Sequence, residues 1–247
     1  KEKKRTTNSI KQKCILNDTL FLFCTILVVI CAIIETHKQN GNKMKLDSKL
    51  QKIWFTSDLH FNHLNVNKFC NRPCNKDNLT KDEMNNYIFQ QLNVIEDNDT
   101  VYHIGDFAML NKNDTKTLKL LVNQLKGNWL FILGNHDIEN NLREVCKGTK
   151  HKILGHYNED LKYKGYRFVL CHYPMESWRN SYRGLTIMVH GHTHGSINHK
   201  QPKNRIDVGF DAQSFKPLTI DEVVGKVESN KELLTHHHIG QENGVQL

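Results

Sequence analysis

Metal-binding residue types recur at five places in this chain, each directly after a short apolar run that is typical of a β-strand. The five motifs are Asp58-Leu59-His60, Gly105-Asp106, Gly134-Asn135-His136-Asp137, His172 and His190-Gly191-His192-Thr193-His194. Ligands of an open α/β sheet bind just beyond the carboxyl ends of its strands, so motifs at five such ends can converge. The sequence therefore predicts one shared metal site.

The donor groups in these motifs indicate which metals to expect. Carboxylate, imidazole and amide groups together suit manganese, iron or zinc better than calcium, and none of the five motifs contains cysteine. Seven residues fill two coordination shells if Asp106 bridges: Asp58, His60, Asp106, Asn135, His172, His192 and His194. Two divalent ions roughly 3.5–4 Å apart clamp the attacking and leaving oxygens of a phosphoryl group. The expected chemistry is hydrolysis of a phosphoester.

Any one of these histidines alone would be explained better as an ordinary core or surface residue. Five such motifs, each at the end of a predicted strand, outweigh that explanation. His103 lies inside an apolar run and is expected in the core. Four further histidines are expected to face solvent or to support the site without binding metal: His63, His151, His156 and His199.

In this order and spacing, the five motifs resemble those of the calcineurin-like metallophosphoesterase superfamily. The resemblance covers roughly residues 50–225 and includes the Arg72-Pro73 pair and the segment from Asp207 to Asp211. Within the superfamily, the chain is similar to small single-domain phosphoesterases of bacteria and phages. The resemblance implies an α/β fold, a four-layer sandwich of two mixed β-sheets packed face to face and flanked by α-helices.

The resemblance also implies how the two ions share their ligands. One ion would take Asp58, His60, Asp106 and His194, and the other would take Asp106, Asn135, His172 and His192. A hydroxide bridging the two ions would attack phosphorus. His136 would protonate the departing oxygen, and Asp137 would orient His136.

The substrate is left open by the sequence. Phosphomonoesters and phosphodiesters are not separable, and a nucleotide or nucleic-acid phosphodiesterase is the alternative enzyme. Three residues after His172 favour this alternative, because they could stack on a base and pair with a phosphate: Trp178, Arg179 and Arg183. Loop packing explains them equally well, and Arg72 either faces a phosphate or braces its turn. A non-catalytic binding scaffold would lack a metal ligand, and none of the seven is missing.

Charge is distributed unevenly along the 247 residues. The formal net charge is +8, but residues 1–43 hold eight Lys/Arg against three Asp/Glu, leaving 26 against 23 for the rest. The nearly neutral body lacks the electrostatic footprint of a dedicated nucleic-acid-binding protein. Seven cysteines form no pattern of a secreted disulfide scaffold, which favours reduced thiols in the cytoplasm.

The segment 1–43 has two interpretations. Residues 1–13 are basic and residues 20–34 are apolar, which resembles a signal anchor and would place the protein at a membrane. The apolar run is shorter than the ~20 residues that span a bilayer comfortably. No methionine precedes Met44, and a start there would give a complete cytoplasmic enzyme, the interpretation favoured here. One domain over 50–225 and a polar tail over 226–247 are expected.

Two helices can be predicted between the motifs. Thr80 and Glu83 form a capping box, followed by apolar residues on one helical face. Asp114 can cap a second helix that stops near Gly127. Strands and helices alternate at first and strands dominate later, so we expect parallel pairing to give way to mixed pairing.

Overall fold

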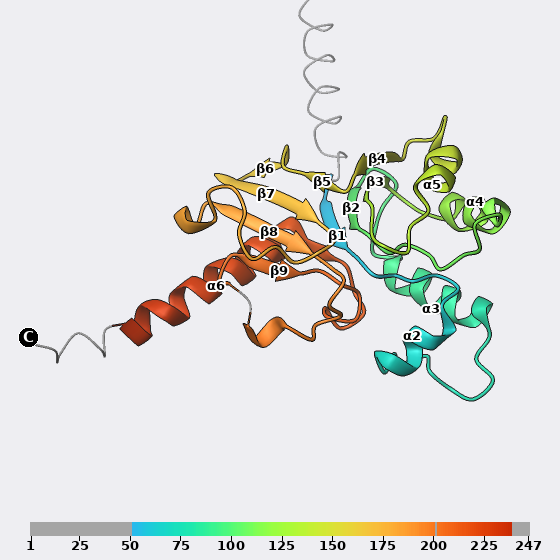
Figure 1. Cartoon of the computed structure of the whole chain (residues 1–247), viewed down its shortest axis with the longest axis horizontal. Coiled ribbons are helices and arrows are strands. Elements are labelled where there is room, and N and C mark those ends of the chain that lie inside the picture. The colour runs from blue at the N-terminus through green and yellow to red at the C-terminus, as the bar shows by residue number, and fades with distance from the viewer. Residues whose placement is uncertain (1–50, 201, 239–247) are drawn as a thin grey trace, which may run out of the picture. The chain divides into compact units, whose positions relative to one another are not determined.

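The computed structural model describes residues 51–200 and 202–238 (Figure 1). The predictions for residues 1–43 lie outside the described residues. The compact unit that contains the predicted site begins at Gln51. Among the helices that the structure describes, none is long and apolar enough to cross a membrane.

The first sheet has five strands in the order β10-β1-β2-β3-β4. Its parallel strands are β1 (Ile53–Thr56), β2 (Thr100–Ile104), β3 (Asn128–Ile132) and β4 (Lys152–Gly155). The short strand β10 (Leu218–Thr219) pairs antiparallel with β1. Because β1, β2 and β3 are parallel and adjacent, the three motifs that follow them emerge at one edge of the sheet.

The second sheet has the order β5-β7-β8-β9, with β6 also paired to β7. Its strands are β5 (Tyr157–Asn158), β6 (Lys162–Tyr163), β7 (Tyr166–Cys171), β8 (Thr186–His190) and β9 (Arg205–Asp207). β7, β8 and β9 are parallel, whereas β5 and β6 run antiparallel to β7. His172 and the His190–His194 motif therefore also leave their strands at a common edge. Both sheets are mixed, as expected.

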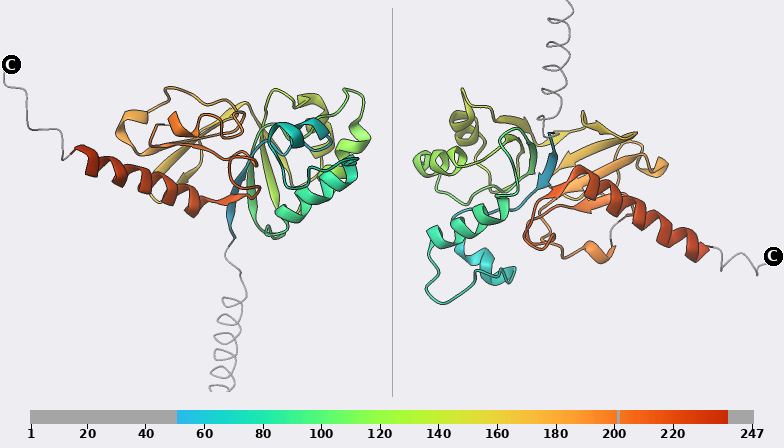
Figure 2. Two further views of the ribbon diagram at one scale, coloured as in Figure 1. Left: turned by 90° about the horizontal axis from the view of Figure 1, so that it is seen from below. Right: turned by 180° about the vertical axis from the view of Figure 1, so that it is seen from behind.

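Helices cover the outer face of the first sheet (Figure 2). They are α2 (Leu64–Phe69), α3 (Lys81–Leu92), α4 (Thr115–Asn123) and α5 (Glu139–Cys146). The capping box of Thr80 and Glu83 is present at the start of α3, and the Asp114 carboxylate accepts from the Thr117 amide at 3.2 Å to cap α4. Gly127 follows α4 with φ 79°, a conformation that glycine adopts without strain.

The two sheets pack face to face through alternate residues of their strands. Phe55 of β1 and Phe168 of β7 stack with ring centroids 5.7 Å apart, and both are fully buried. Their neighbours on the first sheet, such as Trp54, point to the opposite side, into the core shared with α3, α4 and α5. This period-two division of side chains is what two buried faces require. The predicted two-sheet sandwich with flanking helices is confirmed.

The last helix, α6 (Ile220–His238), extends past residue 225. The sequence after residue 225 is polar, which predicts a tail. The structure instead continues the helix through this segment to His238. Val223, Val224 and Val227 lie on one face of α6 and are buried between the sheets. This part of the helix is mostly polar, and its apolar residues are Val227, Leu233 and Leu234, so the sequence gives only a weak helical signal there.

Candidate metal centre

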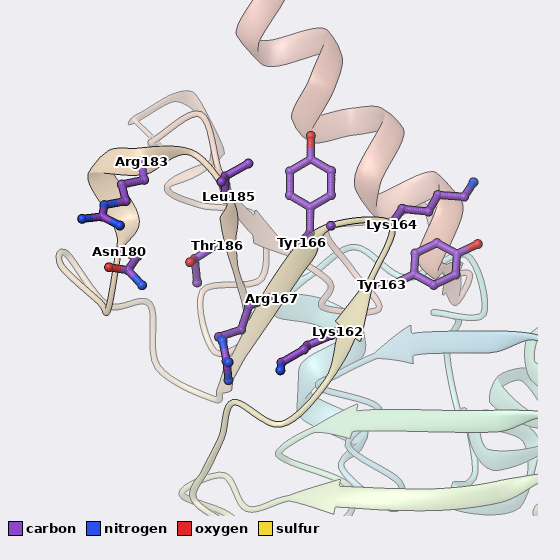
Figure 3. A pocket seen from close by; sticks show the side chains of 10 residues that line it. Lys162, Tyr163, Lys164, Tyr166, Arg167, Asn180, Arg183, Leu185 and Thr186 are labelled. Carbon is purple, nitrogen blue, oxygen red and sulfur yellow. The ribbon is translucent and has the colours of Figure 1, made fainter.

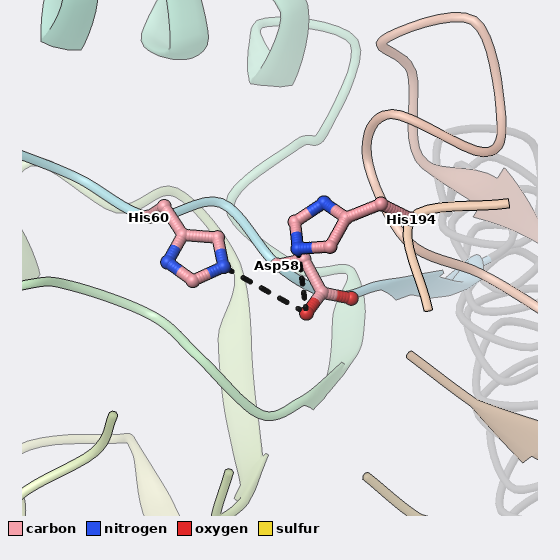
Figure 4. A group of neighbouring side chains, drawn as sticks. All are labelled: Asp58, His60 and His194. Carbon is pink, nitrogen blue, oxygen red and sulfur yellow. Dashed lines mark ion pairs between the residues drawn. The ribbon is translucent and has the colours of Figure 1, made fainter. Parts of the chain in front are cut away.

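Three predicted ligands come together where the two sheets meet. Asp58 follows β1 directly, His60 lies two residues further, and His194 comes from the segment after β8. Oδ1 of Asp58 lies 3.9 Å from Nε2 of His60 and 4.0 Å from Nε2 of His194 (Figure 4). A donor atom of each residue lies within 4.8 Å of the other two, so these residues form one candidate cluster for a metal ion.

A second cluster surrounds Asp106, which follows β2. Its Oδ2 atom lies 3.4 Å from Nε2 of His172 and 3.7 Å from Nε2 of His60. Asn135 Oδ1 lies 3.2 Å from the same His172 nitrogen. Asp58, Asp106 and His172 also offer donor atoms within 4.8 Å of one another. The two carboxylates thus lie among imidazoles of both clusters, and these donor atoms could hold a metal ion.

The spacing of these donor atoms fits bound metal ions. Nitrogen and oxygen ligands lie roughly 2.0–2.2 Å from such an ion, so two ligands of one ion are about 3–4 Å apart. The separations of 3.4–4.0 Å at Asp58 and Asp106 match this range. His60 is only 2 % exposed, and neither of its ring nitrogens has a hydrogen-bond partner. A buried imidazole without partners is costly, and a metal ion would satisfy it.

Two of the histidines are oriented by hydrogen bonds on the side away from the cluster. Nδ1 of His172 donates to the carbonyl oxygen of Ile104 at 2.8 Å. Nδ1 of His194 donates to Oδ2 of Asp211 at 2.6 Å. In both rings the proton on Nδ1 leaves Nε2 with its lone pair toward the cluster, the tautomer that binds a metal. His172 Nε2 and Asn135 Oδ1 are then both acceptors, and a shared cation would relieve their repulsion.

Asp211 and Arg72 form a buried ion pair behind His194. The Arg72 guanidinium donates to both oxygens of Asp211, at 2.7 and 2.9 Å, and to the carbonyl oxygens of Asp58 and Leu59. Arg72 is 1 % exposed, so it braces the turn and does not face a substrate phosphate. This corrects one of the two interpretations of Arg72. The sequence indicates no role for Asp211, because its partner Arg72 lies 139 residues away in the chain.

The backbone of the centre is strained where it carries ligands. Five of the seven predicted ligands have positive φ although none is glycine: Asp58 (55°), His60 (52°), Asp106 (58°), His192 (68°) and His194 (47°). Each such residue costs of order 1–3 kcal/mol and persists only where the surroundings impose it. Close packing is one such constraint: a Cβ atom at Gly134 would overlap Oδ1 of Asp106, and one at Gly191 would overlap Asp58. The glycines beside the ligands are therefore steric requirements.

The Gly134–Asp137 turn positions Asp106. The backbone N–H of His136 donates to Oδ1 of Asp106 at 2.9 Å, which leaves Oδ2 to face the imidazoles. Asp137 accepts from the amides of Asp106, Phe107 and Gly134 at 2.8–2.9 Å. The sequence prediction had Asp137 orient the His136 ring. In the described residues its carboxylate instead holds the backbone that carries Asp106, and no hydrogen bond joins it to the imidazole.

Burial shifts the pKa values of several predicted ligands at the centre. Burial raises the pKa of the Asp58 carboxyl to about 7, because the ionised form loses its hydration. Burial also lowers the pKa of His60 to about 2. Burial acts in the same downward direction at His194, but the hydrogen bonds to Asp211 and Cys70 and the charge of Asp58 together outweigh it and raise that pKa to about 10. A divalent ion would favour the ionised aspartate and the neutral His60, which are the forms that bind metal.

His192 lies at the exposed rim of this arrangement. Its backbone N–H donates to both oxygens of Asp58, and its ring centroid lies 5.1 Å from that of His172. Its ring nitrogens do not join the described clusters of donor atoms, so the structure brings His192 near the second cluster without placing it in one. Tyr173 packs edge-on against both rings, at 5.3 Å and 4.6 Å, and is 49 % exposed. The sequence assigned no role to Tyr173, whose only signal is its position after His172.

The three residues predicted to bind a base and phosphates do not gather at the centre. Trp178 is 8 % exposed and packs with Val169 and Met188, so the packing alternative describes it. Arg179 forms an ion pair with Glu159 at 3.1 Å. Arg183 lies three residues before β8, at the opposite end of the strand from His190. The segment after His172 runs back along the outer face of the second sheet. This path places Trp178, Arg179 and Arg183 away from the metal centre.

One of the described cysteines lies beside the metal centre. Cys70, Cys74, Cys146 and Cys171 are all free. Cys70 has its sulfur 3.4 Å from Nδ1 of His194, and these two residues and Asp211 make a further group of potential ligands. The hydrogen bond from Nδ1 to Asp211 already uses the nitrogen that such a group would need. We therefore assign His194 to the cluster of Asp58 and His60.

Comparisons with known proteins agree with this geometry. The profile of the family described as calcineurin-like phosphoesterase matches residues 51–244. An uncharacterised protein of Methanocaldococcus jannaschii is 33 % identical over 192 residues, which cover 75 % of this chain and 97 % of that protein. A solved structure of a protein of unknown function from Aquifex aeolicus superposes with a TM-score of 0.52 at 21 % identity, covering 71 % of this chain and 98 % of that one. The chain belongs to the calcineurin-like phosphoesterase family.

Proposed function

We propose that the protein is a metal-dependent phosphoesterase that uses two divalent ions to hydrolyse a phosphomonoester or phosphodiester. The observation that supports this most strongly is the environment of Asp106. One carboxylate oxygen is held by the His136 amide, and the other faces imidazoles from two different sheets. A carboxylate placed in this way can serve two ions at once.

Manganese, iron and zinc suit the donor set of carboxylates, imidazoles and an amide oxygen. When bound, two such ions would provide a hydroxide at neutral pH and would stabilise the charge on the phosphoryl oxygens. The chain supplies their ligands on strained, tightly packed turns. Such turns cannot relax easily, so the donor atoms are preorganised.

His136 is suited to act on the leaving group. Its ring is partly exposed at 36 % of the side chain, and Nε2 lies 4.0 Å from Oδ2 of Asp106. The ring therefore borders the cluster while remaining open to a substrate. We assign to it the donation of a proton to the departing oxygen. Asp137 contributes by fixing the turn that carries both His136 and the backbone contact to Asp106.

A nucleotide phosphodiesterase is the second candidate, and Tyr173 is the observation that favours it. Trp178 and the arginines no longer support this function, because they lie elsewhere. Tyr173 offers a half-exposed ring in contact with His172 and His192. A nucleobase attached to the bound phosphate could stack there. A non-catalytic scaffold is disfavoured, because the chain keeps all seven predicted ligands.

Activity measurements on the full chain test the proposal. We expect hydrolysis of p-nitrophenyl phosphate or its bis ester after reconstitution with manganese, iron or zinc. Cyclic nucleotides and single-stranded DNA extend the assay to the second candidate. Asp106→Asn should lose most bound metal and nearly all activity, since one carboxylate serves both ions. Asp82→Asn, an exposed change in α3, is the matched control. A folded Asp106→Asn variant with two equivalents of metal and normal turnover would refute the bridging role.

A further inference from the structure

Figure 3 shows a pocket beside the β6–β7 hairpin of the second sheet. It lies toward the start of β7 and β8, opposite the strand ends that carry the metal centre. It has a volume of about 500 Å³, within the range of sites for small molecules. One wall is the hairpin of β6 and β7, and the other is the segment from Asn180 to Thr186. Arg167 in this wall precedes His172 by five residues of β7, or roughly 16 Å of strand. The pocket is therefore separate from the metal centre.

The charges that line this pocket are all positive. Its lining includes Lys162, Lys164, Arg167 and Arg183, and no aspartate or glutamate. Lys162 and Arg167 are directly opposite each other in the β6–β7 pairing. Like charges at directly opposite positions of two strands destabilise a sheet. The hairpin thus carries a repulsion that an anion in the pocket would relieve.

Neighbouring carboxylates neutralise only part of this charge. Asp221 of α6 pairs with Lys164 at 2.6 Å, and in the described residues Lys162 has no such partner. One Arg167 nitrogen donates to the backbone oxygen of Glu159, which leaves most of its guanidinium donors unused. The Arg183 guanidinium donates from Nε to the Tyr182 hydroxyl and lies over the Tyr182 ring, and within the part of the chain that the structure describes it forms no ion pair. Among the described residues, Lys162, Arg167 and Arg183 therefore line this pocket without a carboxylate partner.

From this arrangement we infer that the pocket binds a small molecule carrying two or more phosphate groups. Guanidinium groups match phosphate oxygens with paired hydrogen bonds, and the lysine adds a mobile charge. Asn180 and Thr186 add neutral hydrogen-bonding groups to the same lining. Either inorganic tripolyphosphate or a nucleoside triphosphate presents the required chemistry. This site does not depend on the proposed hydrolysis, because it shares no residue with the metal centre.

Calorimetric titration of the full chain with inorganic tripolyphosphate tests the inference. The double variant Lys162→Gln/Arg183→Gln removes two charges from exposed side chains and should weaken binding about tenfold or more, since each charged hydrogen bond contributes substantially. Lys81→Gln/Lys152→Gln removes two exposed charges elsewhere and should bind within about twofold of the wild type. Rising salt should weaken wild-type binding more than binding by the pocket variant. Equal affinity in the pocket variant and the wild type would overturn the inference.

The metal centre is the other place where phosphate could bind, so a second comparison separates the two sites. Asp106→Asn alters the metal centre and leaves the pocket intact, and it should retain tripolyphosphate binding. Binding that is lost in Asp106→Asn and kept in the pocket variant would assign the ligand to the metal centre and contradict the inference. Parallel titration with a nucleoside triphosphate distinguishes the sources. Tighter binding than tripolyphosphate would favour a nucleotide, and similar binding would favour polyphosphate, either result supporting a phosphate pocket.

Discussion

The Asp211 carboxylate accepts a hydrogen bond from Nδ1 of His194 at 2.6 Å, while the Arg72 guanidinium donates to both of its oxygens. This chain of contacts fixes the ring of His194 so that Nε2 points to Asp58. A carboxylate behind a metal-binding histidine sets its tautomer and strengthens it as a ligand.

Asp211→Asn should lower metal affinity by about 10–100-fold, the usual effect of losing such a partner. The shape of the side chain is kept, so the fold should remain intact apart from the weakened pair with Arg72. Metal titration of the variant followed by atomic absorption measures the change, with Asp82→Asn as the control. Unchanged affinity would mean that Asp211 serves only to neutralise Arg72.

His136→Ala should keep both ions and lose roughly 10²–10⁴-fold in kcat on an alkyl phosphoester, the usual contribution of a positioned general acid. The loss should be far smaller on p-nitrophenyl esters, because p-nitrophenolate departs without a proton. Parallel kinetics on the two ester types, together with metal analysis, check this outcome. An equal loss on both would assign His136 to binding the phosphoryl group, and a loss of metal would make it a ligand.

Trp178→Ala should destabilise the fold by about 3–5 kcal/mol, because it empties a buried position between Val169 and Met188. Arg179→Ala removes only an exposed ion pair and should change stability by less than about 1 kcal/mol. Urea denaturation measures both. In neither folded variant should KM for nucleotides change more than KM for p-nitrophenyl phosphate. A selective rise in KM for nucleotides would restore the stacking role that burial argues against.

His103 makes the stability of the protein depend on pH. Burial lowers its pKa to about 3, and neither ring nitrogen has a partner in the described core. In the unfolded chain the imidazole takes up a proton near pH 6.5, whereas in the folded chain it stays neutral until the pH is much lower. Stability from this group is therefore complete above that pH and declines as the pH falls toward 3. His103→Leu should remove the effect, so that the wild type loses about 2 kcal/mol more than the variant between pH 7 and pH 5. Equal losses in the two proteins would show that folding does not lower the pKa of His103.

Much of the fold and the centre follows from local patterns in the sequence. The strands before Asp58, Asp106 and Asn135 are short apolar runs with clear ends, so their parallel pairing places these residues at one edge. The capping residues of α3 and α4 act within a single turn, and they too were predictable. These features depend on residues close together in the chain.

What the sequence did not predict depends on partners that are distant in the chain. Nothing near Arg72 indicates that Asp211 will meet it, and nothing near Asp137 indicates that its oxygens will bind the amides of Asp106 and Phe107. Trp178 has the composition of a binding loop, but the path of that loop over the sheet decides its burial. In each case the side-chain type suggested a reactive role, and tertiary packing gave it a supporting one.

The division of the ligands between two sheets makes each bound ion a cross-link. Asp58 and Asp106 belong to the first sheet, whereas His172 and His194 follow strands of the second. An ion shared between them would close a long loop of chain, much as a disulfide does, and its binding energy would add to the stability of the closed sandwich. During synthesis no complete site can exist until the segment with His194 has emerged. Metal binding would then join the two halves of the domain.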